Sequence, residues 1–382
     1  MKSIELFTGA GGLALGTALA GFEHEAVLER DHDSCETLRL NKSRRIPHVR
    51  DWSICETDVR LFDYSDFGHV DLVAGGVPCQ PFSLGGKHGG HKDERDMFPE
   101  LTRAVQALRP LAFIVENVKG LLRGSFAEYF EYVILRLSHP GAKRRGDWRE
   151  HRAALERIHT ASRSTGLDYN VVFQLLNAAD YGVPQRRERV FIVGFRSDLG
   201  VSWSFPSPTH SRESLLRSQW MTGEYWERHG LRESKRPPPE NRAAQWIERN
   251  QLGLDDGLKP WRTVRDALDG LITPRTTAND LDHFLNPGAR AYTGHTGSPW
   301  DEPAKVLKAG DHGVPGGENT LAIGDGTVRY FSVREAARLQ SFPDEYLFAG
   351  SWTERMRQIG NAVPVDLARA VAESVAETIT TF

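Results

Sequence analysis

The chain has 382 residues, of which 39% are hydrophobic and 26% charged, and its net charge is −3. This composition is typical of a soluble globular protein with a large and a smaller domain. Because the net charge is not positive, the chain as a whole gives no sign of nucleic-acid binding. The sequence has no apolar run long enough to predict a transmembrane helix, and its first residues lack the apolar core of a signal peptide. The three cysteines are too sparse to predict a disulfide framework or a zinc site.

Short apolar runs alternate with helical patterns from residue 1 to about residue 195. The runs expected to form strands are Ile4–Phe7, Glu25–Leu28, Val70–Ala74, Phe113–Val115, Val171–Leu175 and Arg189–Phe195. Apolar residues recur at helical spacing in Gly12–Leu19, Cys35–Asn41, Phe98–Leu108 and Phe126–Leu137. Strands that alternate with helices predict an α/β fold with a doubly wound, mostly parallel sheet of the Rossmann-like kind.

The pattern changes after Arg196, where prolines, glycines and tryptophans become frequent. Residues 198–326 are therefore expected to form a second, smaller, loop-rich domain. Helical patterning returns at Ser332–Gln340 and at Val365–Thr378. We therefore expect the first domain to be discontinuous, with residues 1–197 and 327–382.

The segment Gly76-Val77-Pro78-Cys79-Gln80-Pro81 presents a thiol directly after a strand-like run. The proline fixes the backbone before Cys79, and the glycines leave space for a flat ligand, as a nucleophilic thiolate requires. For a lone cysteine, a half-buried position in a turn is the commoner explanation. The other motifs of the chain therefore decide whether Cys79 is catalytic.

Three features near the N-terminus predict an adenosine-containing cofactor. Glycines in Leu6–Gly12 follow the first strand and open the first helix, so a ligand can approach the backbone there, although the turn is not the dinucleotide GxGxxG pattern. Glu29 ends the second strand, where it suits ribose hydroxyls, and Asp58 with Val59 ends the third, near an adenine amino group. Each acid alone could be a capping or loop carboxylate.

Two further segments carry charged groups toward the same edge of the sheet. Glu116 ends an apolar strand and is expected beside the loop of Cys79, where burial would raise its pKa so that it acts as an acid. The alternative is a carboxylate that caps a helix. Arg187 and Arg189 alternate just before the last strand, on one face, and suit a phosphate or the polar edge of a base.

Taken in order, these motifs resemble those of the cytosine-C5 DNA methyltransferase family of the bacterial type. The similar segments are Phe7–Gly12 (cofactor motif), Gly76–Gln80 (Pro-Cys loop), Glu116–Val118 (Glu-Asn-Val) and Gln185–Arg189 (Gln-x-Arg-x-Arg). Arg334–Asp344 and Gln358–Pro364 resemble the last two motifs of the family. Six motifs in the family's order, covering the chain outside residues 200–326, make the resemblance specific.

The resemblance implies an enzyme that transfers a methyl group from S-adenosylmethionine to duplex DNA. The cofactor product would be S-adenosylhomocysteine, and no metal is implied. The Cys79 thiolate would add to C6 of a flipped-out cytosine, while Glu116 protonates or hydrogen-bonds N3 and C5 takes the methyl group. Arg189 would hold the base O2, and Arg187 would position Glu116 or the backbone. Ser83 would meet the phosphate of the flipped nucleotide.

The resemblance also assigns ligand-binding residues by position. The cofactor-binding residues expected from it are Phe7, Gly9, Gly11, Gly12, Leu13, Glu29, Asp58, Val59, Pro78, Phe98, Asn361 and Ala362. The substrate-binding residues expected from it are Gln80, Ser83, Asn117, Val118 and Gln185. Residues 198–326 correspond in position to the family's target-recognition region.

The resemblance predicts a cytoplasmic, monomeric bacterial enzyme with no membrane partner, either solitary or paired with a restriction endonuclease that acts on the same site without a stable complex. The polar stretch 138–168 is longer than the family core requires. It is either an insert that contacts DNA phosphates or a solvated addition, and the second interpretation is slightly favoured.

Three alternatives remain at this point. A tRNA cytosine methylase of the same family is disfavoured by the large second domain, which suits base reading in DNA grooves. A non-catalytic homologue is disfavoured because Cys79, Glu116 and Arg189 are all present. A nicotinamide oxidoreductase would leave the Pro-Cys motif unexplained.

Overall fold

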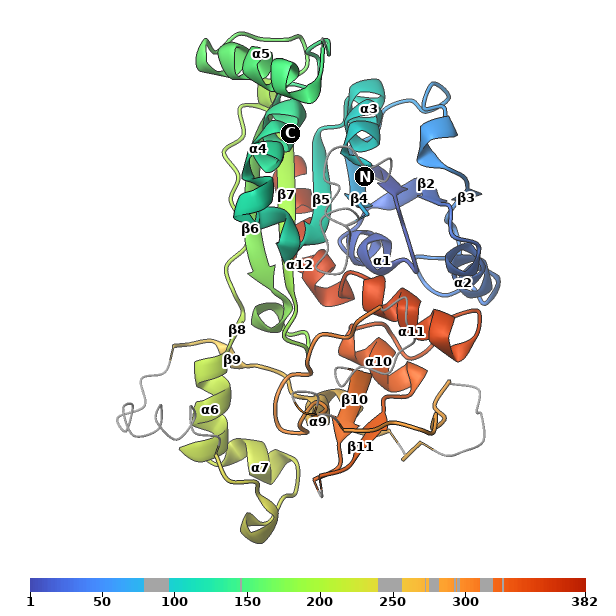
Figure 1. Cartoon of the computed structure of the whole chain (residues 1–382), viewed down its shortest axis with the longest axis vertical. Helices are drawn as coiled ribbons and strands as arrows, with labels where there is room; N and C mark the ends of the chain where they lie inside the picture. Colours follow the sequence, from blue (N-terminus) through green and yellow to red (C-terminus); the bar gives the residue numbers. More distant parts are fainter. Residues whose placement is uncertain are drawn as a thin grey trace.

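The centre of the molecule is a seven-stranded sheet with the strand order β3-β2-β1-β4-β5-β7-β6 (Figure 1). The structure is a computed structural model that describes residues 1–78, 96–144, 146–239, 256–271, 273–274, 282–291, 293, 296–309, 319–324 and 326–382. The strands are β1 (Lys2–Leu6), β2 (Glu23–Glu29), β3 (Ile54–Glu56), β4 (Leu72–Gly76), β5 (Ala112–Val118), β6 (Tyr169–Asn177) and β7 (Glu188–Arg196). Only β7 runs antiparallel to its neighbours. The predicted mostly parallel α/β sheet is confirmed.

Helices cover both faces of this sheet. The helices around it are α1 (Gly12–Leu19), α2 (His32–Ser43), α3 (Phe98–Leu108), α4 (Ala127–Ser138), α10 (Val333–Leu339), α11 (Trp352–Asn361) and α12 (Val365–Ile379). One core cluster joins α12 and Leu13 of α1 to β4, β5 and β7, and another joins α3 and α4 to the opposite face. Short 3-10 helices connect these elements: η1 (Val59–Leu61), η3 (Lys119–Leu122), η4 (Gly124–Phe126), η5 (Ala178–Tyr181) and η6 (Ser197–Leu199); η7 (Glu233–Lys235) follows in the smaller region. Across the described part of the chain, no helix is both long and apolar enough to cross a membrane.

A smaller, irregular region follows the sheet. Its elements are β8 (His210–Ser211), α6 (Arg212–Trp220), α7 (Glu224–Arg228), β9 (Lys259–Pro260), α9 (Val264–Leu268), β10 (Thr320–Ala322) and β11 (Val328–Tyr330). Trp226 is fully buried in a small core of its own with Leu215 and Tyr225. The buried residues of α9 instead join the cluster of α10 and α11. The two regions thus share part of one core.

Within the described residues, the stretch 138–168 starts at the last residue of α4 and then forms α5 (Trp148–Thr160), which packs on α4. The Trp148 and Tyr129 rings meet edge to face, with 5.6 Å between their centroids. The Arg152 guanidinium lies 2.8 Å from the Glu131 carboxylate, so its charge is partly neutralised by the protein. Helix α5 and the small region lie at opposite ends of the long axis of the molecule (Figure 1). This placement favours the interpretation of the stretch as a surface addition.

Strand β1 carries a buried carboxyl group that the motifs did not indicate. Glu5 is fully buried, and within the described ranges neither of its carboxyl oxygens has a hydrogen-bond partner. Alternation along the strand places it on the same face as Ser3, whose hydroxyl lies 2.9 Å from the His24 ring. Burial raises the pKa of Glu5 well above its usual value, because the charged form loses its hydration.

We predict that Glu5→Gln makes the protein increasingly more stable than the wild type as the pH rises. The folded wild type keeps a proton that the unfolded chain releases near pH 4.5, so its stability falls as the pH increases above that value. The difference in unfolding free energy should grow by up to about 1.4 kcal/mol per pH unit. Urea unfolding between pH 5 and pH 8 measures it, with the exposed Glu23→Gln as control. A pH-independent difference would contradict the prediction.

Candidate active site

A cavity of about 530 Å³ opens at the carboxyl ends of β1, β2, β4 and β5. The strand order reverses at β1, and ligands of open α/β sheets bind outside the strand ends at such a point. The predicted site residues that line it are Phe7, Gly9, Gly12, Leu13, Glu29, Asp58, Val59, Pro78, Glu116, Asn117, Val118, Arg189, Asn361 and Ala362. The structure therefore brings together most of the predicted cofactor residues and two of the predicted catalytic ones.

The turn between β1 and α1 brings its backbone to the cavity. Phe7 has a φ of 56°, an uncommon value for a bulky residue, and it directs the chain from the strand into the turn. A Cβ on Gly12 would lie 2.2 Å from the Val363 carbonyl oxygen, so glycine permits this close approach. Gly11 does not line the cavity, because it packs under the Tyr346 hydroxyl, 2.9 Å from where its Cβ would be. Gly11 thus packs beneath the turn, and its predicted cofactor role stays a prediction.

Glu29, at the end of β2, is held against the cavity wall by main-chain groups. Its Oε2 atom accepts a hydrogen bond from Gly9 N–H, and its Oε1 atom accepts from Arg30 N–H and Asp31 N–H, each at 2.7 Å. A carboxylate has about four lone-pair sites, so Oε2 retains one for a ligand. The side chain is thus a fixed acceptor facing the cavity.

Asp58 follows β3 and begins η1. Its carboxylate accepts from Arg60 N–H at 3.0 Å and pairs with the Arg60 guanidinium at 2.5 Å, with Arg30 3.5 Å away. The hydrogen bonds and charge of Arg60 hold the pKa of Asp58 well below its usual range. Asp58 is therefore an ionised acceptor at neutral pH, shared with two arginines.

The opposite wall carries a buried ion pair. Glu116 on β5 is 7% exposed and lies beside Gly76 of β4 in the strand register. The Arg189 Nε atom lies 2.8 Å from Glu116 Oε1, because the start of β7 runs antiparallel beside the end of β5. Burial raises the pKa of Glu116, and the charge of Arg189 opposes part of that rise. Glu116 is therefore placed to exchange a proton with a ligand in the cavity.

Asn117 fixes the chain that leads to the Pro-Cys segment. It is 1% exposed, its Nδ2 atom donates to Val77 O at 3.2 Å, and its Oδ1 atom accepts from Val118 N–H at 2.8 Å. Both ends of the amide thus contact the main chain. Pro78, the next residue after Val77, lines the cavity, so Asn117 positions the point where residue 79 begins.

Two residues of the Gln-x-Arg-x-Arg motif lie behind the cavity wall. Arg187 is fully buried and donates to Leu307 O at 3.0 Å, Gly360 O at 2.7 Å and Ala362 O at 3.0 Å. Gln185 is also fully buried and accepts from Leu307 N–H at 3.1 Å. Neither side chain lines the cavity. Any effect of Arg187 on catalysis, or of Gln185 on substrate binding, therefore acts through these main-chain contacts.

The remaining predicted residues lie elsewhere. Phe98 is 3% exposed in the core at the start of α3 and does not line the cavity. Cys79, Gln80 and Ser83 fall outside the described residues, so their roles stay predictions. Within the ranges that the structure describes, no group of three or more histidine, cysteine or acidic residues could hold a metal ion.

The sequence motifs missed four charged residues of the cavity: Arg30, Asp31, Arg60 and Arg357. The Nη2 atom of Arg357 lies 3.0 Å from Asp31 at the start of α2. The last motif signal begins at the next residue, Gln358, so no pattern pointed to this arginine. Arg357 joins two walls of the cavity that are far apart in the sequence.

Comparison with known proteins identifies the family. The model of the C-5 cytosine-specific DNA methylase family matches residues 1–141 and 149–377. The Type II methyltransferase M.NgoMIV of Neisseria gonorrhoeae is 31% identical over 99% of this chain and 97% of its own length, and M.Eco47II of Escherichia coli is 32% identical over 97% and 78%. The fold is similar to that of the S. pombe Dnmt2 methyltransferase, with a TM-score of 0.57 and 16% identity over 100% of this chain and 99% of that one. The chain therefore belongs to the C-5 cytosine-specific DNA methylase family.

Proposed function

We propose that this protein is a sequence-specific DNA (cytosine-5)-methyltransferase that transfers a methyl group from S-adenosylmethionine to C5 of a cytosine flipped out of duplex DNA. The observation that carries this proposal is the cavity with Glu29 on one wall and the Glu116–Arg189 ion pair on the other. The first wall suits an adenosine cofactor and the second suits the polar edge of a base. Family membership supports the same reaction.

The cavity fits the proposed cofactor in size and in chemistry. Its volume of about 530 Å³ lies within the range usual for small-molecule sites. The remaining acceptor position on Glu29 suits a ribose hydroxyl, and the carboxylate of Asp58 suits an amino group. S-adenosylmethionine, when bound, supplies an electrophilic methyl group on a positively charged sulfur. We propose that no metal takes part, because the sulfonium already activates the methyl group.

The protein groups would act on the base in sequence. The Cys79 thiolate adds to C6 and forms an S–C6 bond, while the displaced electron pair moves toward N3, where Glu116 donates a proton or a hydrogen bond. C5 thereby becomes nucleophilic enough to accept the methyl group. Loss of the C5 proton to a base then supplies the electron pair of the C5–C6 double bond, and the thiolate leaves.

Arg189 would hold the base while this charge develops. Its guanidinium contacts Glu116 and lines the cavity, so it can also donate to O2 of the cytosine. Arg187 would support this arrangement from behind through the wall at Gly360 and Ala362. The base must leave the helix first, at a cost of a few kcal/mol, because C6 is stacked in duplex DNA.

We propose that residues 198–326 form the target-recognition domain and that residues 1–197 and 327–382 form the catalytic domain. The substrate is duplex DNA, with Gln80, Ser83 and Val118 contacting the flipped nucleotide. The relatives named above are Type II methyltransferases, which supports a role beside a restriction endonuclease of the same specificity. A monomeric, cytoplasmic enzyme completes the proposal.

We predict that the protein methylates one short DNA sequence and that Cys79→Ser abolishes this activity, lowering the rate about 10³-fold or more because no covalent adduct forms. Bisulfite sequencing of plasmid DNA from cells that express the wild type or the variant measures the methylated sequence and the extent of methylation. Cys55→Ser, which changes a half-buried cysteine away from the cavity, should behave as the wild type. Plasmid DNA without 5-methylcytosine, from cells that contain folded wild-type protein, would contradict the proposed function.

We predict that Glu116→Gln lowers the rate by about 10²- to 10⁴-fold, because the amide cannot transfer a proton to N3.

Arg189→Gln should move the alkaline limb of the pH profile of kcat/KM to higher pH, because loss of the guanidinium charge lets the pKa of Glu116 rise further. Arg196→Gln is the matched control, since Arg196 lies at the other end of β7 and pairs with Asp198 at 2.7 Å instead. An alkaline limb that stays in place in Arg189→Gln would contradict this role of the ion pair.

A further inference from the structure

One segment of the proposed target domain contacts both the helices of that domain and the back of the cavity wall. We call residues 298–309 the strap. We propose that the strap couples the target-recognition domain to the cofactor cavity, and that Asp301 is a positioning residue for cofactor binding. This inference rests on the proposed function, because it takes the cavity as the cofactor site.

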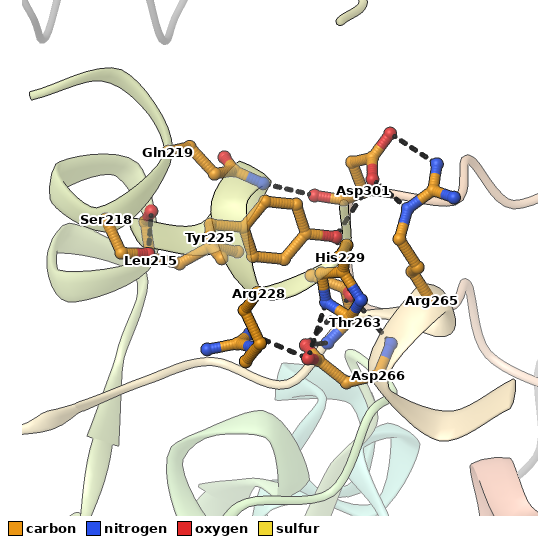
Figure 2. Close-up of polar contacts among 10 residues, drawn as sticks. All are labelled: Leu215, Ser218, Gln219, Tyr225, Arg228, His229, Thr263, Arg265, Asp266 and Asp301. Atoms are coloured by element: carbon orange, nitrogen blue, oxygen red, sulfur yellow. Dashed lines mark hydrogen bonds and ion pairs between the residues drawn. The ribbon is translucent and has the colours of Figure 1, made fainter. Parts of the chain in front are cut away.

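The target-domain end of the strap is anchored at Asp301. Its Oδ1 atom accepts from the Tyr225 hydroxyl at 2.9 Å and from Arg265 Nε at 2.6 Å, and its Oδ2 atom accepts from Arg265 Nη2 at 3.1 Å (Figure 2). Its main-chain oxygen accepts from Gln219 Nε2 at 2.7 Å. The side chain is 13% exposed. Asp301 thus ties α6, α7 and α9 to the strap.

The middle of the strap pairs with the segment before β7. Ala304 N–H donates to Pro184 O, and Arg186 N–H donates to Ala304 O, each at 2.9 Å. The Glu302 carboxylate adds an ion pair to Arg186 at 3.0 Å. These contacts hold the strap parallel to the Gln-x-Arg-x-Arg motif, so it cannot slide without breaking main-chain hydrogen bonds.

The other end of the strap supports the cavity wall. Arg187 donates to Leu307 O in the strap and to Gly360 O and Ala362 O in the wall, so one buried guanidinium joins the two segments. A Cβ on Gly360 would lie only 2.6 Å from Ala309 N, so the two backbones are in direct contact. Because Gly360 and Ala362 line the cavity, a displaced strap changes the cavity itself.

These contacts make the strap a physical connection between two binding sites. A buried hydrogen-bond donor or acceptor that loses its partner destabilises the protein more than an exposed one does. The strap therefore keeps its hydrogen bonds and moves together with the residues that anchor it. A change in the target domain at Asp301 therefore reaches the wall at Gly360. Coupling of this kind is reciprocal, so any change in DNA affinity that the cofactor causes equals the change in cofactor affinity that DNA causes.

The test measures S-adenosylhomocysteine binding by isothermal titration calorimetry, without DNA and without turnover. Asp301→Asn should weaken binding about fivefold or more, although residue 301 does not line the cavity. The matched control is Asp266→Asn. Asp266 belongs to the same polar network and is equally buried at 13%, but its partners Arg228, His229 and Thr263 do not belong to the strap (Figure 2). This control should lower the unfolding temperature without changing the dissociation constant beyond about twofold.

A second variant keeps the test decisive if Asp301→Asn does not fold. Arg265→Lys keeps the positive charge but loses the bidentate contact with Asp301, and it should also weaken binding. Wild-type affinity in folded Asp301→Asn or Arg265→Lys, or an equal loss in Asp266→Asn, overturns the strap proposal. No binding of S-adenosylhomocysteine by the wild type itself would instead overturn the proposed function.

Discussion

The arrangement of the cavity depends on the reversed direction of β7. A parallel β7 would begin at the opposite edge of the sheet from the end of β5, whereas the antiparallel strand places Arg189 beside Glu116 at 2.8 Å. The ion pair compensates part of the cost of burying two charged side chains, and removal of one partner would leave the other uncompensated. The parallel register of β4 and β5 places Gly76 beside Glu116, so the chain that leads to Cys79 starts at this edge. The reversed β7 and the parallel β4 thus bring three features together beside β5: the buried Glu116, the arginine that we propose holds the base, and the start of the segment that leads to Cys79.

Strong local signals allowed parts of the fold to be predicted closely. Helices α1 and α3 have the predicted bounds, because a glycine turn precedes the first and Pro99 in the first turn favours the start of the second. The helix α11 was not predicted as an element, although its last residues belong to a motif. Strand β3 has only three residues, too few for a periodic pattern. Short elements depend on tertiary contacts that a local pattern does not contain.

The candidate site was also predictable from the sequence only in part. Residues at strand ends, such as Glu29 and Glu116, reach the cavity as predicted, because parallel strands present their carboxyl ends at one edge. Within a motif, however, sequence does not separate a side chain that faces the ligand from one that supports the wall. Arg189 lines the cavity while Arg187, two residues earlier, bonds main-chain carbonyls behind it. The strap had no sequence signal, because its contacts join segments that lie far apart in the chain, from Pro184 to Gly360.

The central claim is that Cys79 acts as a covalent nucleophile at this edge of the sheet. Its most direct test is incubation with S-adenosylmethionine and a duplex that carries 5-fluorocytosine at the methylated position, followed by denaturing electrophoresis and peptide mass spectrometry. Fluorine at C5 cannot leave as the proton does, so the account predicts a stable adduct of the DNA on the peptide that contains Cys79. The absence of that adduct, under conditions where the same duplex with ordinary cytosine is methylated, would contradict it.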